Sequence, residues 1–291
     1  MQPVFRFAPS PNGLLHLGHA YSALLNERLA RTCKGRLLLR IEDIDILRCK
    51  PEFEHAIYED LGWLGLQWEK PVLRQSERFD AYGKAFACLK DMGVVYPCFC
   101  SRKDIAQAVA DHMTEEVDPD GAPIYPGTCR GLSLAEVHSR INRGDEHAWR
   151  LDVEKALACI DEPLIYERFE PDQNNNAVKS ISAFECYSLR WGNPIIVRKE
   201  TPTSYHLSVV VDDAQQGVTQ VVRGRDLEPA TDLHVLLQKL LGLPTPVYYH
   251  HELIRGGQGE KLSKSLFSES LAELRAKENT PEDIRRMLGF Y

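Results

Sequence analysis

The sequence has 291 residues, of which 43% are hydrophobic and 26% charged, and its formal net charge is −7. This composition excludes a disordered chain and predicts a globular protein with one large domain, or one domain plus an insertion. The acidic balance also excludes a globally basic surface, so that any RNA contact must come from a local patch. Weak candidates for such a patch are Arg102, Lys103, Arg130, Arg140 and Arg143.

The cysteine spacing and the hydropathy of the sequence indicate the cellular compartment of the protein. The eight cysteines are unevenly spaced, which favours a reducing cytoplasm and a metal site over a disulfide scaffold. No apolar run approaches the ~20 residues of a membrane span, and the N-terminus lacks the features of a signal peptide. We therefore expect a cytoplasmic protein without membrane contact, and a monomer.

The chain opens on a short apolar strand over residues 4–7, a turn with two prolines, and an amphipathic helix from about Leu17. The N-terminus of such a helix favours an anion. His16 and His19 lie three apart and can both point at this terminus, and Gly18 leaves room for a flat ring. The alternative is an ordinary strand–helix turn with two surface histidines.

The next elements predict an open α/β sheet. Gly35 is the expected cap of the first helix, and residues 36–41 form a buried parallel strand whose exit, Glu42, lies where such sheets bind ligands. Helices follow from Pro51 to Gly62 and between Ser76 and Gly93. The fold class is thus α/β, a doubly wound parallel sheet, and residues 1–95 form its first half.

The pattern breaks from residue 96, where prolines and cysteines cluster. We assign residues 96–200 to an insertion, of which 166–200 is a polar, partly flexible excursion. Cys98, Cys100 and Cys129 supply three thiolates of a structural zinc site, which needs four ligands. Ligand chemistry alone suggests His112 as the fourth. The alternative is three unpaired thiols in a loop.

The second half of the sheet is expected over residues 201–250, with strands over 205–213 and 218–222 and a helix from Ala230 to Leu241. Residues 251–291 contain a glycine-flanked basic loop and a last helix opened by Thr280 and Pro281. The loop carries Lys261 and Lys264, which can follow the charge of a moving phosphate. A merely solvated basic loop is the alternative.

His16-Leu17-Gly18-His19 followed by Lys261-Leu262-Ser263-Lys264-Ser265 resembles the two signatures of class I aminoacyl-tRNA synthetases. Further segments resemble the glutamyl-specific branch of that family: Arg6 to Pro11, Arg40 to Asp43, Val210 to Asp213, and Arg223-Gly224. The resemblance implies a Rossmann-like catalytic domain. It also implies Tyr125 as the fourth zinc ligand, because the family follows its C-x-C pair with Y-x₃-C, as in Tyr125 to Cys129.

The resemblance further implies substrates and roles. Glutamate would be held by Arg6, Phe7, Ala8, Pro9, Ser10, Glu42, Tyr205 and Arg223. ATP, arriving with Mg²⁺, would be bound by His16, Gly18, His19 and Lys264, and the catalytic groups would be His16, His19, Lys261 and Lys264. This agrees with the chemistry of a dicarboxylic amino acid, which needs two cations and one anion, here Arg6, Arg223 and Glu42.

Only about 26 residues follow Ser265, so we expect no anticodon-binding domain. A chain of this length resembles catalytic-domain paralogues that attach glutamate to queuosine in the anticodon of tRNA(Asp). Two alternatives stay open. One is a truncated or discriminating synthetase that charges a tRNA 3′ end, and the other is a non-catalytic, zinc-containing RNA-binding module.

Overall fold

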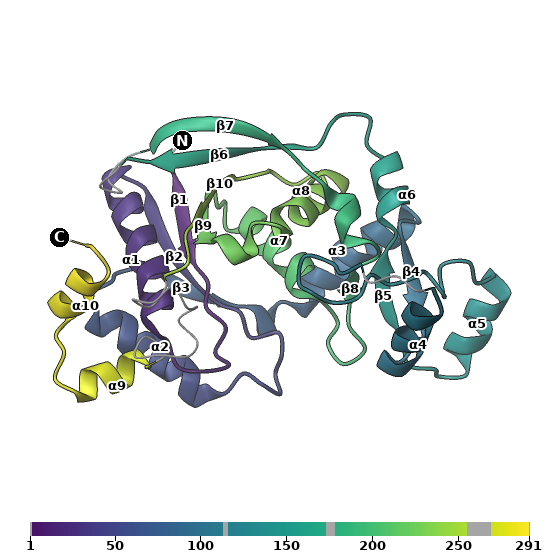
Figure 1. Cartoon of the computed structure of the whole chain (residues 1–291), viewed down its shortest axis with the longest axis horizontal. Coiled ribbons are helices and arrows are strands. Elements are labelled where there is room, and N and C mark those ends of the chain that lie inside the picture. Colours follow the sequence, from purple (N-terminus) through teal and green to yellow (C-terminus); the bar gives the residue numbers. More distant parts are fainter. Residues whose placement is uncertain (1, 113–115, 173–177, 255–268, 291) are drawn as a thin grey trace.

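The structure is a computed structural model that describes residues 2–112, 116–172, 178–254 and 269–290, with the backbone alone at 112 and 178–180. The larger of the two sheets in these residues has seven strands in the order β3-β2-β1-β9-β10-β6-β7 and lies toward the left in Figure 1. Neighbouring strands run parallel except β7, which is antiparallel to β6. The bounds are β1 (Val4–Phe7), β2 (Arg36–Ile41), β3 (Glu69–Arg74), β6 (Ile165–Pro171), β7 (Val178–Glu185), β9 (Gln220–Gly224) and β10 (Val247–His251).

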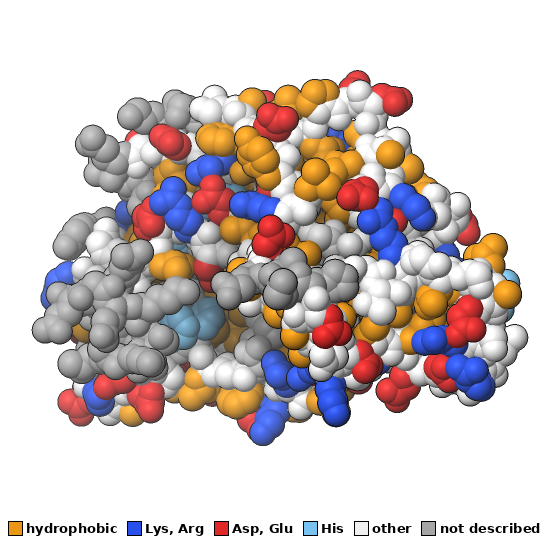
Figure 2. Space-filling view, turned by 45° about the vertical axis from the view of Figure 1, so that its right-hand side comes forward, with side chains coloured by type: hydrophobic (Ala, Val, Ile, Leu, Met, Phe, Trp, Pro, Cys, Tyr) orange, Lys and Arg blue, Asp and Glu red, His pale blue; other side chains and the backbone are white. Residues whose placement is uncertain are grey.

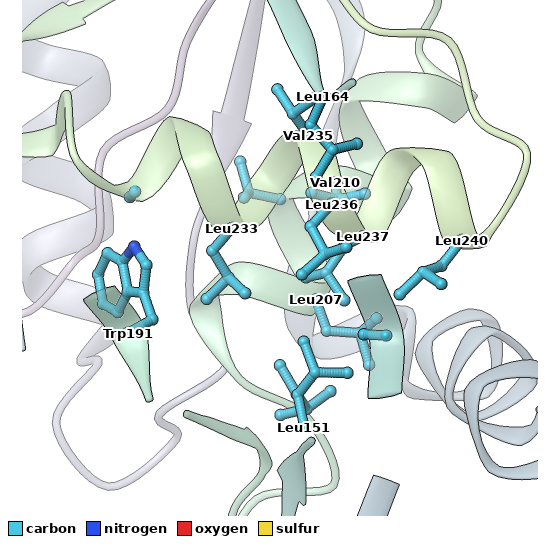
Figure 3. Packing of buried hydrophobic residues seen from close by; sticks show 14 of the residues in the cluster. Leu151, Leu164, Trp191, Leu207, Val210, Leu233, Val235, Leu236, Leu237 and Leu240 are labelled. Carbon is cyan, nitrogen blue, oxygen red and sulfur yellow. The ribbon is translucent and has the colours of Figure 1, made fainter. Parts of the chain in front are cut away.

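Helices cover both faces of this sheet, as a doubly wound fold requires. One hydrophobic core contains side chains of α1 (Leu17–Thr32), α2 (Pro51–Trp63), α9 (Leu271–Ala276) and α10 (Pro281–Met287). The other contains side chains of α3 (Phe79–Asp91), α6 (Val153–Ala158), α7 (Tyr205–Gln215) and α8 (Ala230–Leu240). In the second core Leu207 and Val210 of α7 pack with the leucines of α8 (Figure 3).

The alternation of side chains along the strands decides which residues meet which helices. Phe5 and Val222 belong to the core beneath α1, whereas Val4 and Val221 belong to the core beneath α7 and α8. Two residues beyond Val4, Leu38 and Val221 come arginines: Arg6, Arg40 and Arg223. Because side chains along a strand alternate between the two faces, these three arginines lie on the face that α7 and α8 cover, at the carboxyl ends of the strands.

A smaller antiparallel sheet, in the order β4-β5-β8, lies at the right in Figure 1, away from β1, β2 and β3. Its strands are β4 (Val95–Cys98), β5 (Ala148–Leu151) and β8 (Ile195–Val197), and the helices beside it are α4 (Arg102–His112) and α5 (Leu134–Asn142). Three single turns of 3₁₀ helix, η1 (Gln75–Glu77), η2 (Ser188–Trp191) and η3 (Arg225–Leu227), complete the described elements.

The predictions for the first three elements and for the last helix are confirmed, including Thr280 as the N-cap of α10. The strand predicted over 205–213 is wrong, because these residues form helix α7. The valines of this segment favour a strand by propensity, but packing against α3 and α8 overrides that preference. The cap predicted at Gly35 is also wrong, since Lys34 adopts the left-handed conformation with φ of 51°.

The polar excursion predicted over 166–200 contains regular structure. Its first part is the β6–β7 hairpin, which extends the large sheet through the parallel pairing of β6 with β10. The predicted boundaries at 95, 200 and 250 stay predictions. Within the described residues no helix combines the length and the apolar character needed to cross a membrane.

Candidate active site

A cavity of about 450 Å³ opens at the carboxyl ends of β1, β2, β9 and β10. β1 lies between β2 and β9, so the cavity occupies the point where the strand order reverses, the usual ligand site of open α/β sheets. It is lined by Arg6, Phe7, Ala8, Pro9, Ser10, His16, Gly18, His19, Ser22, Glu42, Tyr205, Val222, Arg223, Gly224, Asp226, Leu227, His251 and Leu253.

Every predicted glutamate- and ATP-binding residue that the structure describes lines this cavity. The predicted Lys261 and Lys264 lie outside the described residues. Both flanks of their segment adjoin the site: Leu253 lines the cavity, and Ser270 forms an isolated β-bridge with His16. Sequence reasoning missed Ser22, Val222, Asp226, Leu227, His251 and Leu253 as lining residues. It also gave no role to Gly224, although the Arg223-Gly224 motif contains it.

A buried ion network ties the first two strands to α7. The carboxylate of Asp213 accepts a hydrogen bond from Arg40 at 2.6 Å and one from Arg6 at 3.2 Å. Arg40, which is fully buried, also donates to Oε1 of Glu42 at 2.9 Å. Because both bonds from Arg40 end on Oε1, Oε2 of Glu42 accepts no hydrogen bond from any described residue. This oxygen is free for a cation in the cavity.

Arg223 differs from the other two arginines in having no acidic partner among the described residues. Arg223 is 5% exposed, and its guanidinium donates to Thr231 at 2.8 Å, to Tyr205 at 3.3 Å and to His250 at 3.4 Å. A fourth contact, at 3.3 Å, is with Nδ1 of His234. All four partners are uncharged at neutral pH when the histidines are neutral. A buried cation without a counter-ion, on the wall of a cavity, is suited to bind an anion.

The two histidines of the first motif cap helix α1. Nδ1 of His16 accepts from the backbone N–H of Gly18 at 3.0 Å, and Nδ1 of His19 accepts from that of His16 at 3.2 Å. A Cβ at Gly18 would lie 2.9 Å from the His16 ring, so glycine permits this arrangement. Burial and the nearby His16 lower the pKa of His19 to about 4. A neutral His19 therefore carries its proton on Nε2, as a donor for a phosphate oxygen.

Cys98, Cys100 and Cys129 also come together, with sulfur atoms within 4.8 Å of one another. The hydroxyl of Tyr125 lies 3.4 Å from Sγ of Cys100 and accepts from the backbone N–H of Cys129 at 2.8 Å. Burial and the neighbouring thiols raise the pKa of Cys100 to about 11. Three thiolates fit the sulfur-rich ligand sets of structural zinc, and the Tyr125 hydroxyl beside Cys100 can supply the fourth bond. The side chain of the alternative ligand, His112, lies outside the described atoms.

We expect one zinc ion per chain, retained through purification without a histidine tag. Cys129→Ser should lose the ion and destabilise the small sheet, because structural zinc contributes directly to folding. Cys88→Ser, which changes an exposed thiol on α3, is the matched control and should keep the metal. Elemental analysis decides the outcome, and full metal retention in Tyr125→Phe would contradict Tyr125 as a ligand.

Three of the five basic residues predicted for an RNA-binding patch are already paired with acids. Arg130 contacts Asp152 at 2.7 Å, while Arg140 and Arg143 pair with Glu136 and Asp145. Figure 2 shows basic and acidic side chains interspersed over one face of the molecule. Of the five, Arg102 lines a second cavity, and the other four line neither that cavity nor the first among the residues that the structure describes.

The fold and the site together define a class I aminoacyl-tRNA synthetase catalytic domain, and the model of "tRNA synthetases class I (E and Q), catalytic domain" matches residues 4–290. A glutamyl-Q tRNA(Asp) synthetase of Rhodobacter capsulatus is 44% identical over 98% of this chain and 99% of its own length. The chain therefore belongs to the glutamyl-Q tRNA(Asp) synthetase family within these class I enzymes, and it is a ligase.

Relatives that charge tRNA are also similar. Glutamate–tRNA ligase 2 of Nitrosococcus oceani is 38% identical over 98% of this chain and 58% of its own length. The crystal structure of glutamate–tRNA synthetase from Elizabethkingia anophelis superposes with a TM-score of 0.70 at 24% identity, over 96% of this chain and 54% of that one. The chain thus spans about half the length of the solved structure, which shares its fold.

Proposed function

We propose that this enzyme activates L-glutamate with ATP, without needing tRNA, and transfers the glutamyl group to queuosine in the anticodon of tRNA(Asp). The observation that carries the first part is Arg223, a buried cation that has no acidic partner among the described residues and faces the cavity. A carboxylate of the amino acid supplies the missing charge.

The rest of the cavity suits the remaining groups of glutamate. Oε2 of Glu42 can accept from the ammonium group, while Arg40 fixes the other oxygen. Arg6 lines the cavity beside Arg223 and can contact the second carboxylate. The phosphates of ATP lie by analogy near the capped start of α1, where neutral His19 donates from Nε2. The α-carboxylate oxygen then attacks the α-phosphorus, and the bond to the leaving pyrophosphate breaks.

The choice of acceptor rests on the relatives. In the second step a hydroxyl of the queuosine cyclopentenediol would attack the acyl carbon, losing its proton as AMP leaves. The relative of 44% identity is a glutamyl-Q tRNA(Asp) synthetase, whereas the glutamate–tRNA ligase is 38% identical and matched over little more than half its length. These alignments favour the anticodon over the 3′ end as the acceptor.

Two measurements test the proposal. Exchange of label between pyrophosphate and ATP should start with glutamate alone, in the absence of tRNA, and with no other amino acid. Labelled glutamate should then remain on the anticodon fragment of queuosine-containing tRNA(Asp) after removal of the 3′ terminus. Exchange that requires tRNA would overturn tRNA-independent activation, and label on the terminal adenosine would favour the conventional charging reaction.

A further inference from the structure

A second cavity, of about 560 Å³, lies between the small sheet and the start of α7. It adjoins the first cavity because Tyr205 lines both. On one side the Tyr205 hydroxyl meets Arg223 at 3.3 Å, and on the other His206 joins the wall of the second cavity. His206 and Arg223 are further linked through His234, with contacts of 3.2 and 3.3 Å. A molecule in the second cavity would thus sit one side chain away from the glutamate site.

The lining of this cavity combines three kinds of group. Flat rings come from Trp191, His206 and Tyr125, and the guanidinium of Arg150 already lies over the ring of Tyr125 at 3.9 Å. Cations come from Arg102, Arg150 and Arg198, and carboxylates from Asp118 and Asp120. Aromatic faces suit a stacked base, guanidinium groups suit a phosphate, and a pair of carboxylates suits an amine.

Two polar atoms in this wall lack partners. Ser204 is 3% exposed, and its hydroxyl has no hydrogen-bond partner among the residues that the structure describes. Nε of Arg150 is likewise unpaired, although another nitrogen of the same group donates to the carbonyl of Asn193 at 2.7 Å. Unpaired buried donors are costly, so a polar ligand that bonds to them would be favoured.

We infer that the second cavity holds the acceptor nucleotide, with its base on the aromatic wall, its phosphate toward the arginines and its amine toward Asp118 and Asp120. This inference rests on the proposed function and deepens it. Queuosine carries a secondary amine between its deazaguanine ring and its cyclopentenediol, and this amine is protonated at neutral pH. A terminal adenosine has no such cation, so the two acids select between the two acceptors.

Ala106→Trp tests whether transfer of the glutamyl group needs the space in the second cavity. Ala106 is an exposed position of α4 that lines the cavity, so an indole there fills space without disturbing a core. We expect kcat/KM for transfer to queuosine-containing tRNA(Asp) to fall about tenfold or more, because this corresponds to losing the stacking free energy of one base. Glutamate-dependent exchange should stay within about twofold. The matched control is Gln107→Trp, at the next, exposed position of the same helix, which does not line the cavity.

Asp120→Asn tests whether the carboxylate of Asp120 binds the amine of queuosine, because asparagine keeps the shape of the side chain and removes its charge. Transfer to queuosine-containing tRNA(Asp) should weaken about threefold to fivefold, as for a partly exposed ion pair, with exchange unchanged. Asp91→Asn, exposed at the end of α3, is the control. If the wild-type enzyme transfers glutamate to queuosine and both cavity variants transfer equally well, the inference is overturned while the proposed function stands. If the wild type shows no transfer to the anticodon, the proposed function itself fails.

Discussion

Replacing Arg223 by glutamine is expected to lower kcat/KM for glutamate in the exchange reaction about 10²–10³-fold, since truncating one partner of a buried charge pair costs about 3–4 kcal/mol. Arg223 is buried on the cavity wall and pairs with no acid among the described residues, so a bound carboxylate would be its counter-ion. The loss should appear mainly in KM for glutamate, with KM for ATP changed little.

Arg225→Gln is the matched control, because Arg225 lies two residues further on, is half exposed, pairs with Glu228 at 3.3 Å and does not line the cavity. Its exchange kinetics should stay within about twofold of the wild type. Thermal unfolding of both variants separates a binding defect from a folding defect. A folded Arg223→Gln enzyme with a wild-type KM for glutamate would show that the carboxylate is held elsewhere.

Several features of the site could be predicted because local rules agree with the tertiary structure. The strand at residues 4–7 and the helix from Leu17 have clear apolar periods, and the turn between them has strong breakers. Arg6 and Glu42 follow from the rule that ligand groups collect at the carboxyl ends of parallel strands. The sulfur cluster could be predicted because Cys98 and Cys100 are separated by one residue and Cys129 lies in the same segment, at a spacing that resembles the family's zinc site.

The counter-ion of Arg6 and Arg40 could not be predicted, because Asp213 reaches them only from a helix. A short apolar run such as Leu207 to Val211 is compatible with a buried strand and with a buried helix, and periodicity alone does not distinguish the two. The pairing of β6 with β10 could not be predicted from the sequence either. That pairing joins segments far apart in the sequence, and the polar residues on the exposed side of the hairpin resemble a loop.

Lowering the pH from 7.5 to 5 is expected to remove about 5 kcal/mol of folding free energy, much of the total for a typical domain. Burial, with nearby Arg223, lowers the pKa of His250 to about 2 and that of His206 to about 3, and His19 is lowered to about 4. In the unfolded chain these histidines titrate near 6.5. Below pH 6.5 the unfolded state therefore binds more protons, and each histidine costs about 2 kcal/mol at pH 5.

Asp60 acts in the opposite direction. Burial raises the pKa of its carboxyl to about 6, so its protonation below that pH favours the folded state and recovers about 1 kcal/mol by pH 5. Urea unfolding followed by circular dichroism at a series of pH values measures the net effect. His55→Gln is the control, because His55 is 76% exposed on α2, and it should reproduce the wild-type curve. A free energy of unfolding that changes by less than about 2 kcal/mol over this range would mean that the buried histidines already accept protons in the folded protein, and the neutral cluster around Arg223 would have to be abandoned.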